Sequence, residues 1–381
     1  MELLKSIFLA SLILIIGCRN TPENEGKRIV DLNNDNKGAE RFAIEKKEGY
    51  TVLRIKNPWQ GAGHISMTSY LVNRGSELPE GIDSADAIFV PVRNIICMST
   101  THTAMISALG EENTITGVSG TTFTFSEVLK KKIENGLIKD VGYEASLNNE
   151  LIINLSPDLI MMYGIGNESA GYVNKISELG VKVLFNADYL ETDPLSKAEW
   201  IKLFGVLYCK EKKADSIFIA EVETYNSIKE YINLNIRSRP KVMLGLPYKD
   251  TWFISPGNSY ISKMIADAGG DYLWKDTKSE ISMPFGLENV FIRAMKADFW
   301  LNTGSISARD DIAAIDHRLS DLPCYKKGNL YNNTGRITPD GGNDYWENGS
   351  VYPHLILKDI ACILHPELFK DHKLFFYRKI L

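Results

Sequence analysis

A long segment without helix breakers divides the sequence into two halves. Within residues 194–235, Gly205 is the only glycine and the opening Pro194 is the only proline. Apolar side chains recur at helical spacing over residues 214–232, and lysines and glutamates fill the other face. A helix over residues 210–233 would be roughly 35 Å long, which exceeds most helices of globular proteins. The pattern fits either a surface helix or a rigid strut that joins two lobes.

On both sides of this segment, short apolar runs alternate with helical patterns that end at glycine or proline. Before it, we expect strands at 94–99, 115–118, 158–163 and 182–185, and helices at 102–109, 151–155 and 171–179. After it, we expect strands at 242–246, 298–302 and 330–333, and helices at 260–268, from about Glu288, and at 352–364. This alternation is typical of parallel sheets and predicts two α/β halves.

Residues 41–56 differ from this rhythm. They alternate like two short strands around a turn at Lys46–Gly49. We interpret them as a β-hairpin, which residues 58–61 and 69–72 could extend.

The first residues form an apolar run that ends at a cysteine. Lys5 precedes the run, and residues 7–16 are too few for a membrane-spanning helix of about 20 residues. The end of the run resembles a bacterial lipobox, in which the peptidase cuts before the cysteine and the thiol of Cys18 carries diacylglycerol. The alternative is an ordinary signal peptide with a chance cysteine. We expect a signal peptide at 1–17 and, because the following residues are polar, a flexible tether at 18–40.

Charge and cysteine spacing exclude several classes of function. The net charge of −5 and the pI of 5.8 leave no strongly basic surface, which argues against nucleic acid as a partner. The remaining cysteines are far apart, contain no CxxC motif and cannot be paired from their spacing. Two of them, Cys97 and Cys209, stand in apolar contexts and are expected to be buried, inert thiols.

Motifs for catalysis and for bare metal ions are absent from the sequence. There is no GxSxG, GxxxxGK[ST] or GxGxxG, so we expect no enzymatic activity. The six histidines form no HxH or HExxH motif, which makes a carrier of a bare ion less probable than a carrier of a chelate.

Several blocks, taken in order, carry a resemblance to a known family. The blocks are VRNIICMSTTHTAMISALGEENTITGVS, NNELIINLSPDLIMMYG, ELGVKVLF, ISPGNSYISKMIADAGGDYLW and LENVFIRAMKADFWL. Together they resemble the periplasmic binding proteins that deliver ferric siderophores, haem and vitamin B12 to ABC importers. The resemblance runs from about Val92 to the C-terminus and leaves residues 41–90 as an addition.

The resemblance implies a fold and a location. The expected fold is α/β, with two Rossmann-like lobes bridged by a single long helix, as in class III periplasmic binding proteins, plus the N-terminal β-hairpin addition. The expected divisions are 41–193 for the first lobe with its addition, 194–238 for the linking helical segment and 239–381 for the second lobe. The chain would lie outside the cytoplasm, held on the membrane by the lipid at Cys18.

The resemblance also assigns a role to one glutamate in each half. Glu150 and Glu288 each stand at the start of an expected helix, where the helix dipole alone would favour an acidic side chain. In the family, such glutamates dock onto arginines of the importer's two membrane subunits. Glu150 lies eight residues before Asp158 and Glu288 lies ten before Asp298, so the second position departs slightly from the first.

Candidate ligand-binding residues follow from the rule that ligands of parallel sheets lie beyond the carboxyl ends of the strands. Aromatic faces and a few polar groups suit a flat or bulky metal chelate, and an arginine suits an anionic one. The candidates are Thr101, His102, Thr121, Phe123, Tyr143, Tyr163, Tyr248, Trp252, Phe285, Arg336 and Trp346. By the resemblance, Tyr143, Phe285 and Trp346 fall where the family contacts its ligand. Some of these aromatic residues are expected to be core instead.

His102 has two interpretations. It could be an axial ligand to haem iron or cobalt, or it could sit at the start of a helix without any ligand role.

Three functions remain open. The first is a lipid-anchored, non-enzymatic carrier without a cofactor of its own, which binds an iron(III)-siderophore, cobalamin or haem and delivers it to an ABC permease and ATPase. The second is a lipoprotein enzyme, a chelatase or reductase, that acts on such a chelate. The third is an adhesive or structural lipoprotein without a ligand.

Overall fold

The computed structural model describes residues 38–143, 146–164, 171, 176–304 and 306–381. The expected signal peptide, Cys18, most of the tether and most of the helix expected at 171–179 lie outside these residues. The described residues form one compact unit.

The first lobe contains a five-stranded parallel sheet in the order β7-β6-β5-β8-β9. Its strands are β5 (Ile95–Cys97), β6 (Ile115–Val118), β7 (Lys139–Asp140), β8 (Leu159–Met162) and β9 (Val183–Phe185). The helices are α1 (Thr100–Ala108), α2 (Glu127–Glu134) and α3 (Asn149–Leu155). Short buried strands that alternate with helices bear out the α/β interpretation of this half.

The second lobe contains a sheet in the order β13-β10-β15-β16-β17, in which only β17 is antiparallel. Its strands are β10 (Lys241–Leu244), β13 (Asp271–Tyr272), β15 (Phe299–Leu301), β16 (Leu330–Asn332) and β17 (Arg378–Lys379). The helices are α8 (Tyr260–Asp267), α9 (Leu287–Ala294), α10 (Arg309–Ile315), α11 (Pro323–Lys326), α12 (Asp344–Glu347) and α13 (Pro353–Leu364). A small antiparallel sheet of β11 (Pro247–Tyr248), β12 (Thr251–Ile254) and β14 (Met283–Gly286) is inserted after β10.

The N-terminal addition is a four-stranded sheet rather than a hairpin alone. The expected hairpin forms β1 (Phe42–Lys46) and β2 (Tyr50–Lys56), and β3 (Ser66–Asn73) and β4 (Ala87–Val90) extend it. Aromatic contacts fix this addition on the rest of the chain: the ring of Phe42 lies 4.8 Å from that of Trp200 in the linking segment, and the ring of Trp59 lies 5.1 Å from that of Phe185 on β9.

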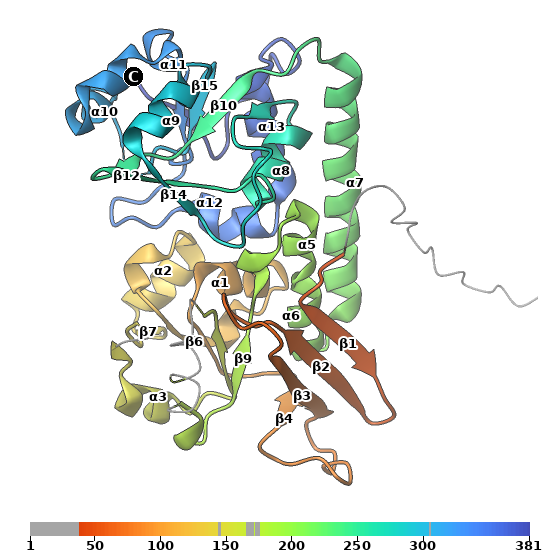
Figure 1. Cartoon of the computed structure of the whole chain (residues 1–381). Coiled ribbons are helices and arrows are strands. Elements are labelled where there is room, and N and C mark those ends of the chain that lie inside the picture. The colour runs from red at the N-terminus through yellow and green to blue at the C-terminus, as the bar shows by residue number, and fades with distance from the viewer. Residues whose placement is uncertain (1–37, 144–145, 165–170, 172–175, 305) are drawn as a thin grey trace, which may run out of the picture. The chain divides into compact units, whose positions relative to one another are not determined.

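The linking segment comprises three helices, α5 (Pro194–Glu199), α6 (Ile201–Leu207) and α7 (Glu211–Asn235). The long helix expected from the sequence is α7, which buries the predicted stripe that includes Ala214, Phe218, Val222 and Ile232. It packs against α5 and α6 at one end and against α8 and α13 at the other, so it is the strut between the lobes (Figure 1).

Both lobes contain an aspartate that accepts backbone hydrogen bonds just before a strand. The Asp158 carboxylate, just before β8, accepts hydrogen bonds from the backbone N–H groups of Arg93 and Asn94 at 2.7 and 3.1 Å. In the second lobe, the Asp298 carboxylate, just before β15, accepts from the Lys241 N–H at 2.9 Å. These bonds tie the start of β8 to the residues just before β5, and the start of β15 to the first residue of β10.

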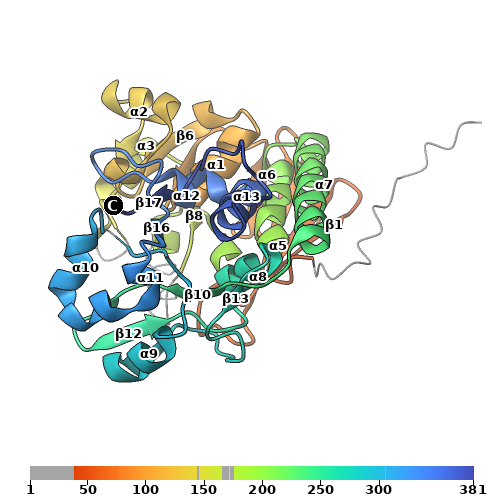
Figure 2. The same ribbon diagram turned by 90° about the horizontal axis from the view of Figure 1, so that it is seen from above.

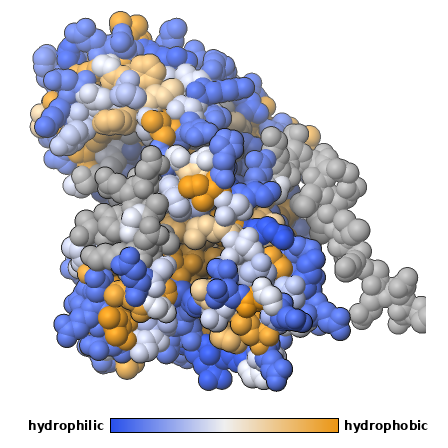
Figure 3. Space-filling view, turned by 60° about the horizontal axis from the view of Figure 1, so that its bottom comes forward, coloured by the Kyte–Doolittle hydropathy of each residue, from blue (hydrophilic) through white to orange (hydrophobic). Residues whose placement is uncertain are grey.

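The surface shows no continuous apolar belt on the face drawn in Figure 3, where apolar side chains form separate patches among hydrophilic ones. Among the residues that the structure describes, none of the helices combines the length and apolar character needed to cross a membrane.

Candidate functional site

An exposed aromatic pair stands on the first lobe, on the loops that follow β6 and β7. Phe123 and Tyr143 are 47% and 51% exposed, and their rings meet edge to face with centroids 6.4 Å apart. Both cover Gly120, whose φ of +73° favours glycine. A Cβ there would come within 2.7 Å of the Phe123 ring and 2.9 Å of the Tyr143 hydroxyl, so the pair needs glycine beneath it.

One carboxylate ties the two aromatic loops together. Asp140 accepts hydrogen bonds from the N–H groups of Gly120 at 3.2 Å, Thr121 at 3.0 Å and Gly142 at 2.9 Å. Partial burial opposes ionisation of Asp140, but the hydrogen bonds from Gly142, Thr121 and Gly120 outweigh it and hold the pKa below its ordinary value. The Thr121 hydroxyl also donates to Asp140, at 3.3 Å, so Thr121 shapes this turn.

On the second lobe, Trp346 is 56% exposed on the short helix α12. Its ring meets the buried ring of Tyr345 edge to face at 4.7 Å. Tyr345 in turn packs against Phe376 and Tyr377, which anchors α12 to the body of this lobe. The Asn343 side chain caps α12 by accepting from the Tyr345 N–H.

Arg336 already has partners within the protein. Its Nε donates to the buried carboxylate of Asp344 at 2.5 Å, and its guanidinium lies over the rings of Phe125 and Phe375, at 4.9 and 4.4 Å from their centroids. The charge of Arg336 is therefore balanced within the protein, which leaves less of it for an anionic ligand.

The other aromatic candidates differ in exposure. Tyr248 on β11 is 67% exposed and lies under the Lys249 ammonium. Phe285 on β14 is half-buried, as is Tyr163, which follows β8 and meets Tyr189 edge to face at 6.4 Å. These three remain accessible, but no contact joins them to the Phe123–Tyr143 pair among the described interactions.

Two expected ligand residues are core residues instead. His102 is fully buried beside Phe204, with ring centroids 6.3 Å apart, and burial lowers its pKa to about 3, an effect that the Met161 backbone carbonyl opposes. Trp252 is also fully buried, donates from its indole N–H to the Leu244 carbonyl at 3.1 Å and packs on Trp300. Neither side chain reaches the surface, so neither can line an open cleft in this conformation.

Thr101 is intermediate in burial between the exposed and the fully buried candidates. It is half-buried in the first turn of α1, and its hydroxyl is 3.1 Å from that of the N-cap residue Ser99. Its main visible role is to shape the start of the helix.

The two proposed docking glutamates are both exposed in first helical turns. Glu150 lies on α3, and Glu288 lies on α9 with 85% of its side chain exposed. Arg318 approaches Glu288 at 3.9 Å, whereas no ion pair of Glu150 is found among the described residues. The helices occupy equivalent positions, each immediately before the strand that neighbours the first strand of its lobe.

Metal-binding clusters of three or more His, Cys, Asp or Glu side chains are absent from the described part of the chain. The thiols of Cys97, Cys209, Cys324 and Cys362 are all free, and Cys97 and Cys324 are buried. Cys209 is exposed, which corrects the expectation of a buried thiol: it lies in the turn between α6 and α7 with a φ of +54°.

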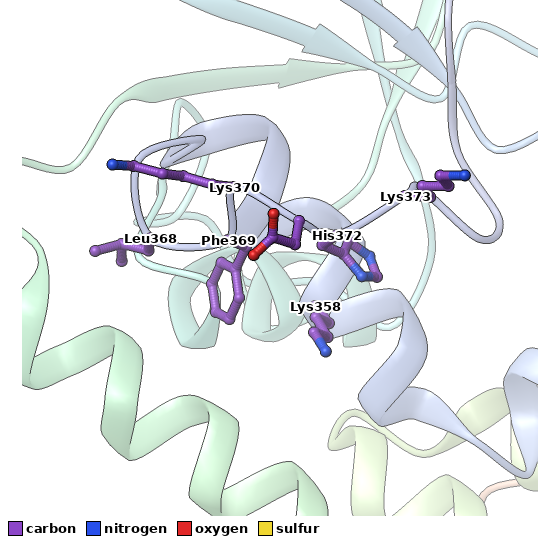
Figure 4. A pocket seen from close by; sticks show the side chains of 7 residues that line it. Lys358, Leu368, Phe369, Lys370, His372 and Lys373 are labelled. Carbon is purple, nitrogen blue, oxygen red and sulfur yellow. The ribbon is translucent and has the colours of Figure 1, made fainter.

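A shallow hollow of about 480 Å³ lies elsewhere, on the C-terminal segment of the second lobe. It is lined by Lys358, Leu368, Phe369, Lys370, Asp371, His372 and Lys373. The labelled lysine side chains point in different directions in Figure 4, so they do not converge on one anion.

The sequence offered little to single out Gly120 and Asp140. A glycine after a strand and an aspartate at the end of another are common in α/β folds, so neither stood out. The signal that could have found them is their order along the chain, since each directly precedes a loop with an exposed aromatic residue.

The sequence and the fold are matched by known proteins. The chain belongs to the periplasmic binding protein family, whose profile matches residues 95–335. An uncharacterized lipoprotein of Methanocaldococcus jannaschii is 30% identical over 387 aligned positions, which cover 92% of this chain and 90% of that protein. The added sheet at 38–90 lies outside the region that the family profile matches.

Solved structures share the fold at low identity. A periplasmic heme binding protein from Pseudomonas aeruginosa superposes with a TM-score of 0.59 at 16% identity, over 76% of this chain and 98% of that one. A periplasmic vitamin B12 binding protein of Vibrio cholerae gives a TM-score of 0.51 at 13% identity, over 74% of this chain and 99% of that one. The similarity confirms the expected class of fold.

Proposed function

We propose that this chain is the lipid-anchored substrate-binding protein of an ABC importer and that it binds a metal chelate between its two lobes. The observation that carries the proposal is the set of half-exposed rings of Phe123 and Tyr143 on the first lobe and Trp346 on the second, in a chain of this family. Large flat faces of this kind suit a conjugated or bulky chelate better than they suit a small sugar or amino acid.

A chelate fits the chemistry of the described residues better than a bare ion does. Bare Zn²⁺ or Mn²⁺ needs several His, Cys or carboxylate ligands at one point, and the described residues include no such cluster. A chelate brings its own metal ligands. An iron(III)-siderophore is the first choice, and cobalamin or haem is the alternative that the titles of similar structures suggest.

The neutral site favours a chelate whose charge is low or is exposed to solvent. The Arg336 charge is balanced by Asp344, and the exposed aromatic residues carry no charge. Binding would come from ring contacts and desolvation, and the role requires no chemical step in the protein.

Delivery would use the two exposed glutamates. Glu150 and Glu288 are presented by equivalent helices of the two lobes, which suits a partner with two related membrane subunits that each offer arginine. The lipid on Cys18 would keep the protein at the outer surface of the membrane that holds the importer.

Titration of the purified protein with a ferric siderophore panel, cyanocobalamin and haemin tests the proposal. The readouts are the fluorescence of the six tryptophans and the visible spectrum of each ligand, with Zn²⁺ and Mn²⁺ as bare-ion controls. We expect saturable, submicromolar binding of one chelate class and no comparable binding of the ions. Tight binding of an ion alone, or of no chelate in the panel, would contradict the proposal.

A further inference from the structure

A buried carboxylate of the second lobe reaches across to the first. Glu347, the last residue of α12, is 1% exposed. Its two oxygens accept hydrogen bonds from the backbone N–H groups of Phe125 at 2.7 Å and Ser126 at 3.1 Å. These amides lie just before α2, so an acceptor from the other lobe satisfies donors at a helix start.

The cap that α2 supplies for itself is weak, which gives this crossing contact more importance. The Ser126 hydroxyl accepts from the Leu129 N–H at 3.5 Å, the limit for a hydrogen bond. The amides of Phe125 and Ser126 instead point to a carboxylate, and hydrogen bonds to charged groups are stronger than neutral ones.

Two more residues of the second lobe hold the same short segment, residues 124–126. The Arg336 guanidinium covers the Phe125 ring at 4.9 Å from its centroid. Gly342 lies so close to Thr124 that a Cβ on the glycine would stand 2.5 Å from the Thr124 carbonyl oxygen. Residues 124–126 are thus held in three ways. Glu347 accepts hydrogen bonds from two of their amides, Arg336 makes a cation–π contact with Phe125, and the backbone at Gly342 packs closely against Thr124.

This contact lies on a different side of the molecule from the strut. In Figures 1 and 2, α2 and α7 lie apart in both views, with α12 beside α1. Helix α7 packs on both lobes along its length, so a motion that opens the lobes about α7 separates α2 from α12 and must break the bonds of Glu347.

We propose that Glu347 is the interlobe clasp of this protein: its hydrogen bonds to residues 125 and 126 hold the lobes closed and limit how far the ligand site opens. Phe123 lies two residues before Phe125, and Trp346 directly precedes Glu347, so the clasp borders the aromatic residues of the site. The role in ligand retention depends on the function proposed above, whereas the clasp itself depends only on contacts within this chain.

Hydrogen exchange of the purified full-length protein tests the clasp without any ligand. The Glu347→Ala variant removes both acceptors, and we expect the amides of Phe125 and Ser126 to exchange at least about tenfold faster than in the wild type. Amides of β6 in the same lobe should keep their wild-type rates, which shows that the fold is intact.

A matched control separates the clasp from general effects of charge at this helix. Glu127 stands in the first turn of α2 with 76% of its side chain exposed and pairs with Lys130. Glu127→Ala should leave the amides of Phe125 and Ser126 protected. Equal loss of protection in Glu127→Ala and Glu347→Ala, or no loss in Glu347→Ala, would overturn the proposal.

A second pair of variants covers the case in which loss of Glu347 unfolds the lobe. Gly342→Ala places a methyl group against the Thr124 carbonyl and should free the same two amides while the carboxylate stays. Gly286→Ala is the control, because a Cβ there meets nothing within 4 Å. Identical exchange in these two glycine variants would also overturn the clasp.

Small-angle scattering then tests whether the contact restrains the lobes. The radius of gyration should be larger for Glu347→Ala and Gly342→Ala than for the two control variants. Faster amide exchange with an unchanged radius of gyration would mean a local cap and would overturn the restraint. Because neither measurement needs a ligand, a failed clasp is distinguishable from a failed chelate panel.

Discussion

The two lobes share a frame but differ in what they build on it. In the first, β6-β5-β8-β9 run side by side, and in the second, β13-β10-β15-β16 occupy the same order. Asp158 and Asp298 make the same kind of bond before β8 and β15, and each lobe presents a glutamate on the preceding helix. The shared frame therefore carries the two glutamates that we propose for docking to a common partner.

The differences between the lobes lie in their loops and edges. The first lobe adds β7 and, at its carboxyl end, Asp140, which ties the loops of Phe123 and Tyr143. The second adds β17 and the short helix α12, which carries Trp346 and the crossing carboxylate of Glu347. A repeated frame with unlike loops gives an asymmetric site, which suits an asymmetric ligand.

The largest effect is expected for the two glutamates, and it tests whether both lobes dock to the partner. Replacing both Glu150 and Glu288 by arginine should reduce chelate uptake by cells to background, because like charges would meet the partner's arginines. Ligand affinity, measured by titration, should stay at the wild-type value. Wild-type uptake by the double variant would remove these residues from the docking surface.

The single variants sharpen the comparison. Arg318 lies 3.9 Å from Glu288 and already offsets part of its charge, so Glu150→Arg should impair uptake more than Glu288→Arg does. The exposed Glu134 and Glu230 serve as controls for charge reversal elsewhere.

The next effect concerns the core of the second lobe. Trp252→Ala removes a fully buried ring that packs on Trp300, and it should lower the free energy of unfolding by about 3–5 kcal/mol. Tyr248 lies four residues earlier, and its ring is exposed. Tyr248→Ala should therefore change the free energy of unfolding by less than about 0.5 kcal/mol. Urea unfolding of the two variants measures both values, and equal losses would contradict the assignment of Trp252 to the core.

The core of the first lobe should make the stability depend on pH through His102. Burial lowers the pKa of His102 from 6.5 to about 3, so below pH 6.5 the unfolded chain binds a proton that the folded chain does not. The free energy of unfolding must then fall as the pH decreases through this window. Between about pH 7.5 and 5.5 the wild type should lose about 1.4 kcal/mol more than His102→Leu. Parallel urea curves for the two proteins would show that His102 titrates normally.

The smallest effect concerns the clasp. Burial raises the pKa of Glu347 from 4.5 to about 7, the amides of Phe125 and Ser126 oppose this rise, and the nearby Asp344 charge adds to it. Arg336 is paired with Asp344, and Glu127 follows Ser126 in the chain and pairs with Lys130.

In an open form, Glu347 would face water and its pKa would return toward 4.5. The closed form then binds a proton in the window between these values, so acidification favours closure. The radius of gyration of the wild type should decrease from about pH 7.5 to 5.5, and that of Glu347→Gln should not. An increase in the wild type would reverse the sign of this linkage.

Regular features were predictable from the sequence, because periodicity and breakers determine them. The absence of helix breakers and the apolar stripe predicted α7, and the alternating pattern predicted the strands β5, β6, β8, β9, β10, β15 and β16. It did not predict the two-residue strands β7, β13 and β17. The aromatic candidates were predictable only in part. Trp252 and Phe253 are neighbours on β12 and point to opposite faces, so one is fully buried and the other is 55% exposed. The sequence does not show which face meets the core.

Short elements and long-range contacts were not predictable. Helix α12 has four residues, too few for a helical period to appear. The bond between Glu347 and the Phe125 amide joins positions 222 residues apart. The burial of His102 was not predictable, because a polar residue near a helix start gives no sign of the face that is buried. The lipid on Cys18 and the boundaries at 41–193, 194–238 and 239–381 remain predictions.

The central claim is that both lobes contact one ligand, and the most direct test is the affinity of single-lobe variants. The chelate that binds best in the panel would be titrated into Phe123→Ala and Trp346→Ala, with Tyr231→Ala, at an exposed tyrosine of α7, as the control. We expect each of the first two variants to weaken binding roughly tenfold or more through loss of ring contact, while the control binds like the wild type. Wild-type affinity in both Phe123→Ala and Trp346→Ala would contradict a site shared by the two lobes.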